Sequence, residues 1–491
     1  MHRHRVVLFL IGTSLSIAQF IMIRDLVTVL YGEEVVIILV TTSFFFGLSI
    51  GYVFSLLFSE RVFKILLVLS LFLHLTFPYS YRYLAAYIST LDMSGYAYGA
   101  WLLAYALIFN AIFATFLPRF ISQRDGETER LWNLKVFYTL EILGFMVGFF
   151  LVSLLWNRRL VYLLLCYWMI LAILLHLILT NRGLTVIYVG TALLTGVFLP
   201  TIDLHSTAML YRYKHGLRGA RALFSINSPY QKVEVIEDAQ GGRHLYLDGL
   251  ENLNSTDLAV LNYYIATLPA SLIRPEKSLL IGNGTLSSVQ SVSQFSHQVI
   301  SVELDPGVLL AGKQFFTNPA GLRALKHWRL YVDDGKHFLR RNRDTYDLII
   351  MDIPSPLTIQ EAYLHTVEFY RIAQKRLNPD GVIAVQLSGP LQRNNRTPAR
   401  VVAALRQVFR EVMVIHSDKA DRSFAYASMH LPFGKGELLE KGESYERRIK
   451  IVTPSQLDAY LTQAVPLSVD RMDLVLRRGL ERFMDRYFED D

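Results

Sequence analysis

Seven long apolar segments fill the first two hundred residues, and they restrict the fold of this chain more than any other feature. The segments are Val6–Ile23, Val35–Phe58, Val62–Phe77, Tyr98–Leu117, Val136–Trp156, Leu160–Leu179 and Leu184–Leu204. Most of them reach the roughly 20 residues that an α-helix needs to cross a bilayer. We therefore predict a transmembrane helical domain of about seven spans over residues 1–204, with Val62–Phe77 as the shortest span and the lipid bilayer as a partner.

The chain is basic, and the positions of its charges explain why. The formal net charge is +7, and basic residues lie beside the apolar segments, as in MHRHR before the first and RDGETER after the fourth. Lys and Arg at such positions are typical of membrane proteins, so we expect no nucleic acid partner. No small-residue cleavage site follows the first segment, which we interpret as an anchor.

Two pairs of glycines lie within the apolar segments. Gly47 and Gly51, and likewise Gly144 and Gly148, are one helical turn apart, which predicts close helix packing. Packing within one bundle is favoured, and a homo-oligomer is the alternative. The ionisable residues Glu141 and Arg24-Asp25 mark either a transport or substrate path or the membrane interface.

The stretch from Leu279 to Asp305 has the pattern strand, glycine turn, helix, strand, acidic residue. Gly282 and Gly284 would let the backbone turn sharply and approach a ligand. Glu303 lies about twenty residues past these glycines, where a dinucleotide-binding fold places a ribose-binding acid. This pattern predicts a nucleoside site.

Further strand and turn patterns follow in VDDG, YDLIIMD and LNPDGVIAVQ. Strands that alternate with helices at this spacing predict a Rossmann-like, doubly wound and mostly parallel sheet. The predicted fold class is a multi-span α-helical membrane bundle followed by an α/β domain with a small β-hairpin subdomain. The predicted regions after the spans are a linker at 205–227, the β-hairpin subdomain at 228–270, the Rossmann domain at 271–434 and a charged helical tail at 435–491.

Several motifs between Ser228 and Pro390 occur in the order in which spermidine synthases carry their counterparts. They are Tyr230-Gln231, Leu247–Gly249, Ile281–Gly284, Val302–Pro306, Asp333–Gly335, Tyr346–Asp352, Glu368–Tyr370 and Asp380–Gln386. This part of the chain resembles the aminopropyltransferase family, which has a methyltransferase-type, Rossmann-like fold. The apolar half is similar to membrane-anchored spermidine synthase-like proteins of the bacterial inner membrane.

The resemblance implies a sulfonium nucleoside as co-substrate, either decarboxylated S-adenosylmethionine or S-adenosylmethionine, and no metal. Asp352 would be the catalytic carboxylate. The residues implied to hold the nucleoside are Gln231, Gly282, Gly284, Glu303, Asp334 and Gly335. The residues implied to contact a small amine or polyamine substrate are Tyr230, Asp248, Tyr263, Thr285, Ser355 and Gln386.

The sequence departs from the family pattern where the family binds its polyamine. Thr285 stands where an acid is expected to hold the aminopropyl ammonium, and Ser355 replaces a second aspartate. Leu261-Asn262-Tyr263 replaces a Tyr-His-Glu triplet. Because buried ammonium groups need partners, ordinary spermidine synthesis is in doubt.

Three functions follow as alternatives. The first is an alkyltransferase with an altered polyamine site, and the second is a degenerate domain that senses a nucleoside or polyamine and regulates the membrane bundle. The third is a transporter with such a regulatory domain.

The flanking charges also predict a cytoplasmic N-terminus. Seven full crossings would then place the α/β domain outside, away from its expected co-substrate. We therefore expect a cytoplasmic α/β domain and suppose that Val62–Phe77 does not cross fully or that a further segment crosses.

Overall fold

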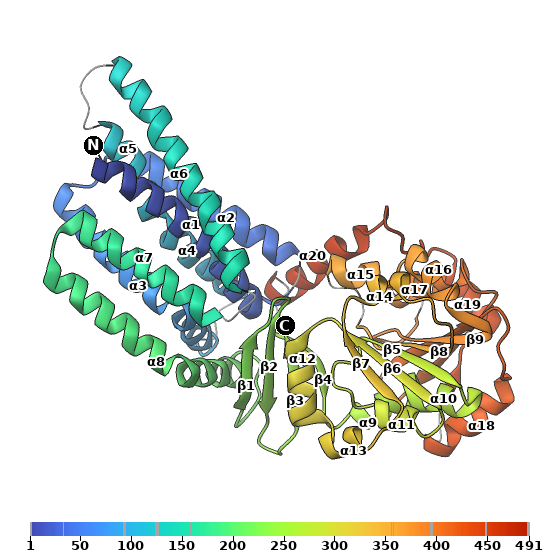
Figure 1. Ribbon diagram of the computed structural model, residues 1–491. Coiled ribbons are helices and arrows are strands. Elements are labelled where there is room, and N and C mark those ends of the chain that lie inside the picture. Colours follow the sequence, from blue (N-terminus) through green and yellow to red (C-terminus); the bar gives the residue numbers. More distant parts are fainter. Residues whose placement is uncertain are drawn as a thin grey trace. The chain divides into compact units, whose positions relative to one another are not determined.

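The computed structural model describes residues 2–32, 34–91, 95–122, 127–156, 160–354, 356, 358–392, 396–446 and 449–488 of the chain (Figure 1). It divides into two compact units. The first comprises residues 1–241, 247–250 and 483–491, and the second comprises residues 242–246 and 251–482.

The first unit is mainly helical. Its helices are α1 (His2–Leu30), α2 (Glu34–Phe54), α3 (Glu60–Ile88), α4 (Gly95–Ala114), α5 (Phe116–Ser122), α6 (Glu127–Trp156), α7 (Leu160–Leu179) and α8 (Arg182–Tyr213). With α4 and α5 taken as one, seven helices in the described residues are long and apolar enough to cross a membrane. Their positions match the seven predicted segments.

The prediction that the third apolar segment is the shortest is wrong. Helix α3 has 29 residues and continues through Pro78 to Ile88. Beyond Phe77 the sequence contains Tyr, Ser and Arg, which lower its apolar character, yet Tyr81, Arg82 and Ala85 are buried. Hydropathy alone predicts that the apolar segment ends near Phe77, and tertiary packing stabilises the helix beyond it.

Close approach between helices depends on the two glycine pairs. A Cβ atom at Gly144 would lie 2.0 Å from the carbonyl oxygen of Phe9 on α1, and one at Gly12 would lie 1.9 Å from that of Glu141 on α6. A Cβ atom at Gly51 would lie 2.1 Å from the carbonyl oxygen of Ala111 on α4. Both pairs thus pack against helices of the same chain, which confirms the prediction of packing within one bundle.

A β-hairpin belongs to the helical unit. Strand β1 (Arg221–Asn227) pairs antiparallel with β2 (Lys232–Glu237). The side chain of Asp203 on α8 forms ion pairs with Arg82 on α3 at 2.6 Å and with Lys232 on β2 at 3.1 Å. The predicted linker 205–227 therefore contains the end of α8 and strand β1, and buried charges fix the hairpin to the helices.

The predicted interface pair Arg24-Asp25 is also enclosed by this hairpin. Arg24 donates to the carbonyl oxygen of Tyr230 at 2.8 Å, and Asp25 is buried. Glu141 accepts a hydrogen bond from the Tyr52 hydroxyl at 3.3 Å.

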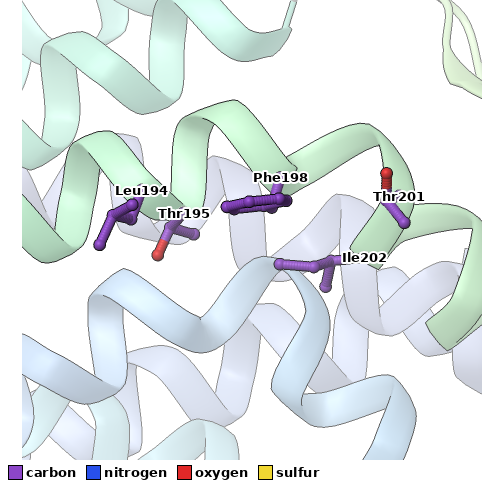
Figure 2. A pocket seen from close by; sticks show the side chains of 5 residues that line it. All are labelled: Leu194, Thr195, Phe198, Thr201 and Ile202. Atoms are coloured by element: carbon purple, nitrogen blue, oxygen red, sulfur yellow. The ribbon is translucent and has the colours of Figure 1, made fainter.

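A small pocket of about 320 Å³ lies along α8. Figure 2 shows the side chains that line it, Leu194, Thr195, Phe198, Thr201 and Ile202. Two hydroxyl groups are the only polar side-chain groups of this lining, so the pocket offers no charge to a ligand.

The second unit is built on an eight-stranded sheet, which confirms the predicted α/β class. Its strand order is β12-β10-β11-β9-β8-β5-β6-β7. The strands are β5 (Lys277–Ile281), β6 (Gln298–Glu303), β7 (Trp328–Val332), β8 (Tyr346–Met351), β9 (Leu377–Gln386), β10 (Glu411–Ser417), β11 (Arg422–Ser428) and β12 (Ile449–Ile451). Strands β5 to β9 are parallel, and β10, β11 and β12 are antiparallel to their neighbours. Two further short strands precede this sheet, β3 (Arg243–Leu247) and β4 (Leu250–Asn254).

Helices cover both faces of this sheet (Figure 1). In β8, Ile349 and Met351 face one core while Leu348 and Ile350 face the other. A strand that is buried on both faces must be apolar, which explains the continuous apolar run Leu348–Met351. The helices are α9 (Leu258–Asn262), α10 (Leu268–Ile273), α11 (Val289–Val292), α12 (Pro306–Ala311), α13 (Pro319–Arg323), α14 (Gly335–Arg341), α15 (Ile359–Tyr363), α16 (Val367–Gln374), α17 (Arg396–Arg406), α18 (Lys435–Tyr445), α19 (Pro454–Leu461) and α20 (Asp473–Phe488).

The predicted C-terminal tail is part of the folded structure. Strand β12 pairs with β10 at the end of the sheet, with Ile451 opposite Ile415. Leu457 and Leu474, from α19 and α20, are buried in one of the two cores.

Candidate functional site

The ends of four parallel strands carry the polar residues singled out by the sequence. Strand β5 lies between β6 and β8, and the chain connections run in opposite directions on its two sides. Ligands of open α/β sheets bind at such a switch point, outside the carboxyl ends of the strands. The turn after β5, Glu303 at the end of β6, Asp352 after β8 and Gln386 at the end of β9 all lie at this edge.

The turn after β5 requires glycine at two positions. Gly282 has a φ of +81°, and its N–H donates to the carbonyl oxygen of Val302 at 3.0 Å. A Cβ atom there would lie 2.8 Å from the carbonyl oxygen of Asp352, and one at Gly284 would lie 3.0 Å from Oε2 of Glu303. The glycines therefore allow the three strand ends to meet.

Asp352 is held by amide groups on both of its carboxylate oxygens. Asn283 Nδ2 donates to Oδ2 at 2.9 Å, and Gln386 Nε2 donates to Oδ1 at 3.1 Å. Burial raises the pKa of Asp352, while the Asn283 hydrogen bond and the positive charge of Arg422 act in the opposite direction. This carboxyl group is thus fixed in position and takes up a proton more readily than an exposed aspartate does.

Glu303 is buried at the end of β6. Its Oε1 accepts a hydrogen bond from the backbone N–H of Asp305 at 2.9 Å. Burial raises the pKa of Glu303 to about 7. Its second oxygen faces the glycine turn, where a hydroxyl group of a ligand could donate to it. Asp305 itself caps α12, since its Oδ1 accepts from the N–H of Gly307 at 2.7 Å.

Asp334 and Gly335 begin α14. The Oδ1 atom of Asp334 accepts a hydrogen bond from the N–H of His337 at 2.7 Å, so one carboxylate oxygen serves as a helix cap. A Cβ atom at Gly335 would lie 2.6 Å from Cγ2 of Ile281, the last residue of β5. This contact places the start of α14 beside the glycine turn.

Thr285 belongs to a short chain of uncharged polar groups. Its hydroxyl lies 2.8 Å from that of Ser287, which donates to Asn262 Oδ1 at 3.2 Å. Tyr263 is occupied elsewhere, since its hydroxyl donates to the carbonyl oxygen of Lys441 and its ring stacks on Tyr445.

Three of the predicted residues belong to the first unit. Lys232 N–H donates to Oδ1 of Asp248 at 2.7 Å, and the carbonyl oxygen of Tyr230 accepts from Arg24. Gln231 lies in the same turn, between β1 and β2. Ser355 lies outside the described residues.

Two residues at the sheet edge were missed by the sequence analysis. Asn283 was only part of the Ile281–Gly284 motif, and Arg422 was not singled out. Arg422 Nη1 donates to Gln386 Oε1 at 3.2 Å, so Gln386 connects the guanidinium to Asp352. An arginine that precedes a buried strand was the available signal.

Comparison with known proteins gives the following matches. Residues 260–417 match the family described as "Spermine/spermidine synthase domain". The polyamine aminopropyltransferase of Thermoplasma volcanium is 27% identical over 195 residues, which are 39% of this chain and 71% of that protein. Spermidine synthase 1 of Datura stramonium is 32% identical over 200 residues, 40% of this chain and 64% of that protein. The chain therefore spans about two thirds of the length of these relatives.

A solved structure, that of spermidine synthase from Thermotoga maritima, is 21% identical, with a TM-score of 0.42 and coverage of 49% of this chain and 88% of that one. Residues 260–417 of this chain are thus similar in sequence to the spermine/spermidine synthase domain.

Proposed function

We propose that this protein is a membrane-anchored transferase that uses a sulfonium nucleoside to alkylate an amine. The nucleoside is decarboxylated S-adenosylmethionine or S-adenosylmethionine. The observation that carries the proposal is Asp352, a partly buried carboxylate with a raised pKa, fixed by two amide donors at the switch point of the sheet. The relatives named polyamine aminopropyltransferase and spermidine synthase support the reaction class.

The chemistry suits a single carboxylate. The lone pair of a neutral amine attacks the methylene carbon beside the sulfonium; a C–N bond forms, the C–S bond breaks, and its electron pair stays on sulfur. Asp352 accepts the proton that the nitrogen sheds. Because burial raises the pKa of Asp352, this proton transfer is more favourable than transfer to an exposed aspartate.

The edge of the sheet also fits the nucleoside. Glu303 presents a carboxylate oxygen to the glycine turn, where it would accept hydrogen bonds from ribose hydroxyl groups. One carboxylate oxygen of Asp334 caps α14, and the second would accept a hydrogen bond from the base of the nucleoside. Gly282 and Gly284 bring the backbone close to both.

Membrane anchoring is supported by the surface of the helical unit. Large apolar side chains on its helices are more than half exposed, among them Phe46, Val53, Phe150, Val186 and Val197. Such a surface is unfavourable in water and suits a lipid environment. We place the α/β unit in the cytoplasm and the helices in the bacterial inner membrane.

The test measures methylthioadenosine release by the purified full-length protein in detergent, with both sulfonium donors and a panel of amines. We expect release by the wild type and a loss of about a hundredfold or more in kcat for Asp352→Asn, which keeps the shape and removes the proton acceptor. Calorimetry with methylthioadenosine should give the same affinity for both proteins, because Glu303 is unchanged.

One observation favours a second function, the sensing of a nucleoside or polyamine. Both oxygens of Asp352 already have protein partners, as they would in a purely structural role. Nucleoside binding without release for any amine, or equal release by wild type and Asp352→Asn, would contradict the transferase and favour the sensor.

A further inference from the structure

Arg422 lies at the edge of the sheet where Asp352 lies. Strand β11 runs antiparallel to β9, with Phe424 opposite Gln386. The residues that begin β11 are therefore beside the carboxyl end of β9, and Arg422 reaches Gln386 there at 3.2 Å. A single side-chain amide thus separates the guanidinium from the carboxylate of Asp352.

The charge of Arg422 is not cancelled by an ion pair. Burial lowers the pKa of Arg422, but a guanidinium remains protonated at neutral pH. The carboxylates of Asp352, Asp257 and Asp421 are near enough to interact electrostatically with it. Among the described residues, no carboxylate lies within 4.0 Å of its nitrogen atoms. Its Nε donates to the carbonyl oxygen of Ala420 at 3.4 Å and Nη1 to Gln386, whereas Nη2 makes no hydrogen bond to these residues.

The side chains that hydrogen-bond to Asp352 are uncharged, and the acidic Glu303, which interacts electrostatically with Asp352, faces the glycine turn. Asn283 and Gln386 contribute amides, and Thr285, Ser287 and Asn262 form a hydroxyl and amide chain. If a diamine dication bound with its reacting amine at Asp352, its second ammonium would lie near the Arg422 guanidinium. That arrangement is unfavourable, because like charges repel and a desolvated ammonium needs an anionic partner.

We propose that the acceptor is a primary amine with an anionic group, carboxylate or phosphate, at its other end. This inference rests on the proposed transferase function. The amine lies at Asp352, and the anion is bound by the free edge of the Arg422 guanidinium, a geometry that suits two-point binding of carboxylate or phosphate. Gln386 sets the spacing between the two, so a short acceptor fits best.

The experiment compares two acceptors of equal length. Putrescine and 4-aminobutyrate share a four-carbon chain and one amine, and they differ in carrying an ammonium or a carboxylate at the other end. With the full-length wild type in detergent, we expect kcat/KM for 4-aminobutyrate to exceed that for putrescine at least tenfold. O-phosphoethanolamine and vesicles of phosphatidylethanolamine distinguish a free phosphate from a lipid headgroup as the source of the anion.

Substitutions at Arg422 assign the preference to its charge. Arg422→Gln should raise KM for 4-aminobutyrate about tenfold or more, change kcat less, and leave putrescine unaffected or improved. Arg422→Lys should restore part of the preference because it restores the charge. Arg410→Gln, which removes an exposed arginine outside the site, is the matched control, and methylthioadenosine affinity reports whether each variant is folded.

The outcomes separate the inference from the proposed function. Release of methylthioadenosine with a wild-type preference for putrescine, or a preference for 4-aminobutyrate that Arg422→Gln does not change, overturns the inference and leaves the transferase standing. The absence of release with any acceptor overturns both.

Discussion

Glu303 is a buried carboxyl group whose protonation changes near neutral pH. Its pKa is about 7, against an ordinary 4.5, because burial disfavours the charged form. Ribose hydroxyl groups would donate to the ionised form, so nucleoside affinity should rise with pH. Between pH 6 and pH 8 we expect methylthioadenosine affinity, measured by calorimetry, to rise about tenfold in the wild type. In Glu303→Gln it should be weak and independent of pH, and Glu437→Gln, at an exposed glutamate of α18, should behave as the wild type.

The same carboxyl group affects stability with a defined sign. A raised pKa in the folded state means that its contribution to stability is fully present below about pH 4.5 and is lost as pH rises through about 7. The loss amounts to about 3 kcal/mol at most. Melting temperatures of Glu303→Gln that fall as steeply with pH as those of the wild type would contradict this assignment.

The sequence identified some of these residues and not others for a physical reason. Glu303 and Asp352 end apolar runs, so a local pattern is enough to place them at the edge of a sheet. Asn283 contacts Asp352, which is 69 residues away in the chain, and Arg422 contacts Gln386, which is 36 residues away. These contacts between strands give the two residues their place in the site. No local pattern contains such a contact.

At the scale of elements, the contact between α1 and α6 leaves no room for added volume. A Cβ atom at Gly148 would lie 2.5 Å from the carbonyl oxygen of Thr13, in addition to the close contacts at Gly12 and Gly144. Gly144→Val should therefore force the helices apart and cost about 1 to 3 kcal/mol or more. We expect a melting temperature several degrees lower in detergent.

Gly190→Val is the matched control, because Gly190 is exposed on α8 and a Cβ atom there would have nothing within 4 Å. The mass of the particle in detergent should be the same for wild type and Gly144→Val. A change in oligomeric state with unchanged melting would instead assign this face to contacts between chains.

Elements that are buried on both sides were predictable, and elements completed by tertiary contacts were not. The strands β5, β6, β8 and β9 appear as apolar runs bounded by Gly, Asp or Pro. The second half of α3 and strand β1 carry mixed residues, and their partners lie far away in the sequence. Arg82, for example, is buried because it pairs with Asp203.

At the scale of the whole molecule, the number of crossings determines the side on which the α/β unit lies. We expect a reporter fused after Asp491 to be active in the cytoplasm, where a nucleoside co-substrate is accessible. Helix α3 is long enough to cross, so its length no longer supports the expectation that it fails to do so. A second reporter at the N-terminus would show whether the number of crossing helices is even, and a C-terminal reporter active only outside the membrane would contradict our placement.

The boundary of the first compact unit does not coincide with the end of the apolar part of the sequence. Apolar character ends near Leu204, yet the first unit continues to Gly241 because Lys232 is buried against Asp203. Composition indicates whether a segment suits an apolar or an aqueous environment. The boundary of a compact unit depends instead on contacts between segments that are distant in the chain.

The short strand β12 has a consequence for how this chain can be shortened. It pairs with only three residues of β10, but it covers part of the outer edge of an eight-stranded sheet. A chain that ended before Ile449 would leave the N–H and C=O groups of β10 open to other molecules, and open edges of this kind promote aggregation. The residues from Ile449 onward thus protect the solubility of this unit at the same edge of the sheet as the candidate site, because Ser417 of β10 lies opposite both Ile449 and Arg422.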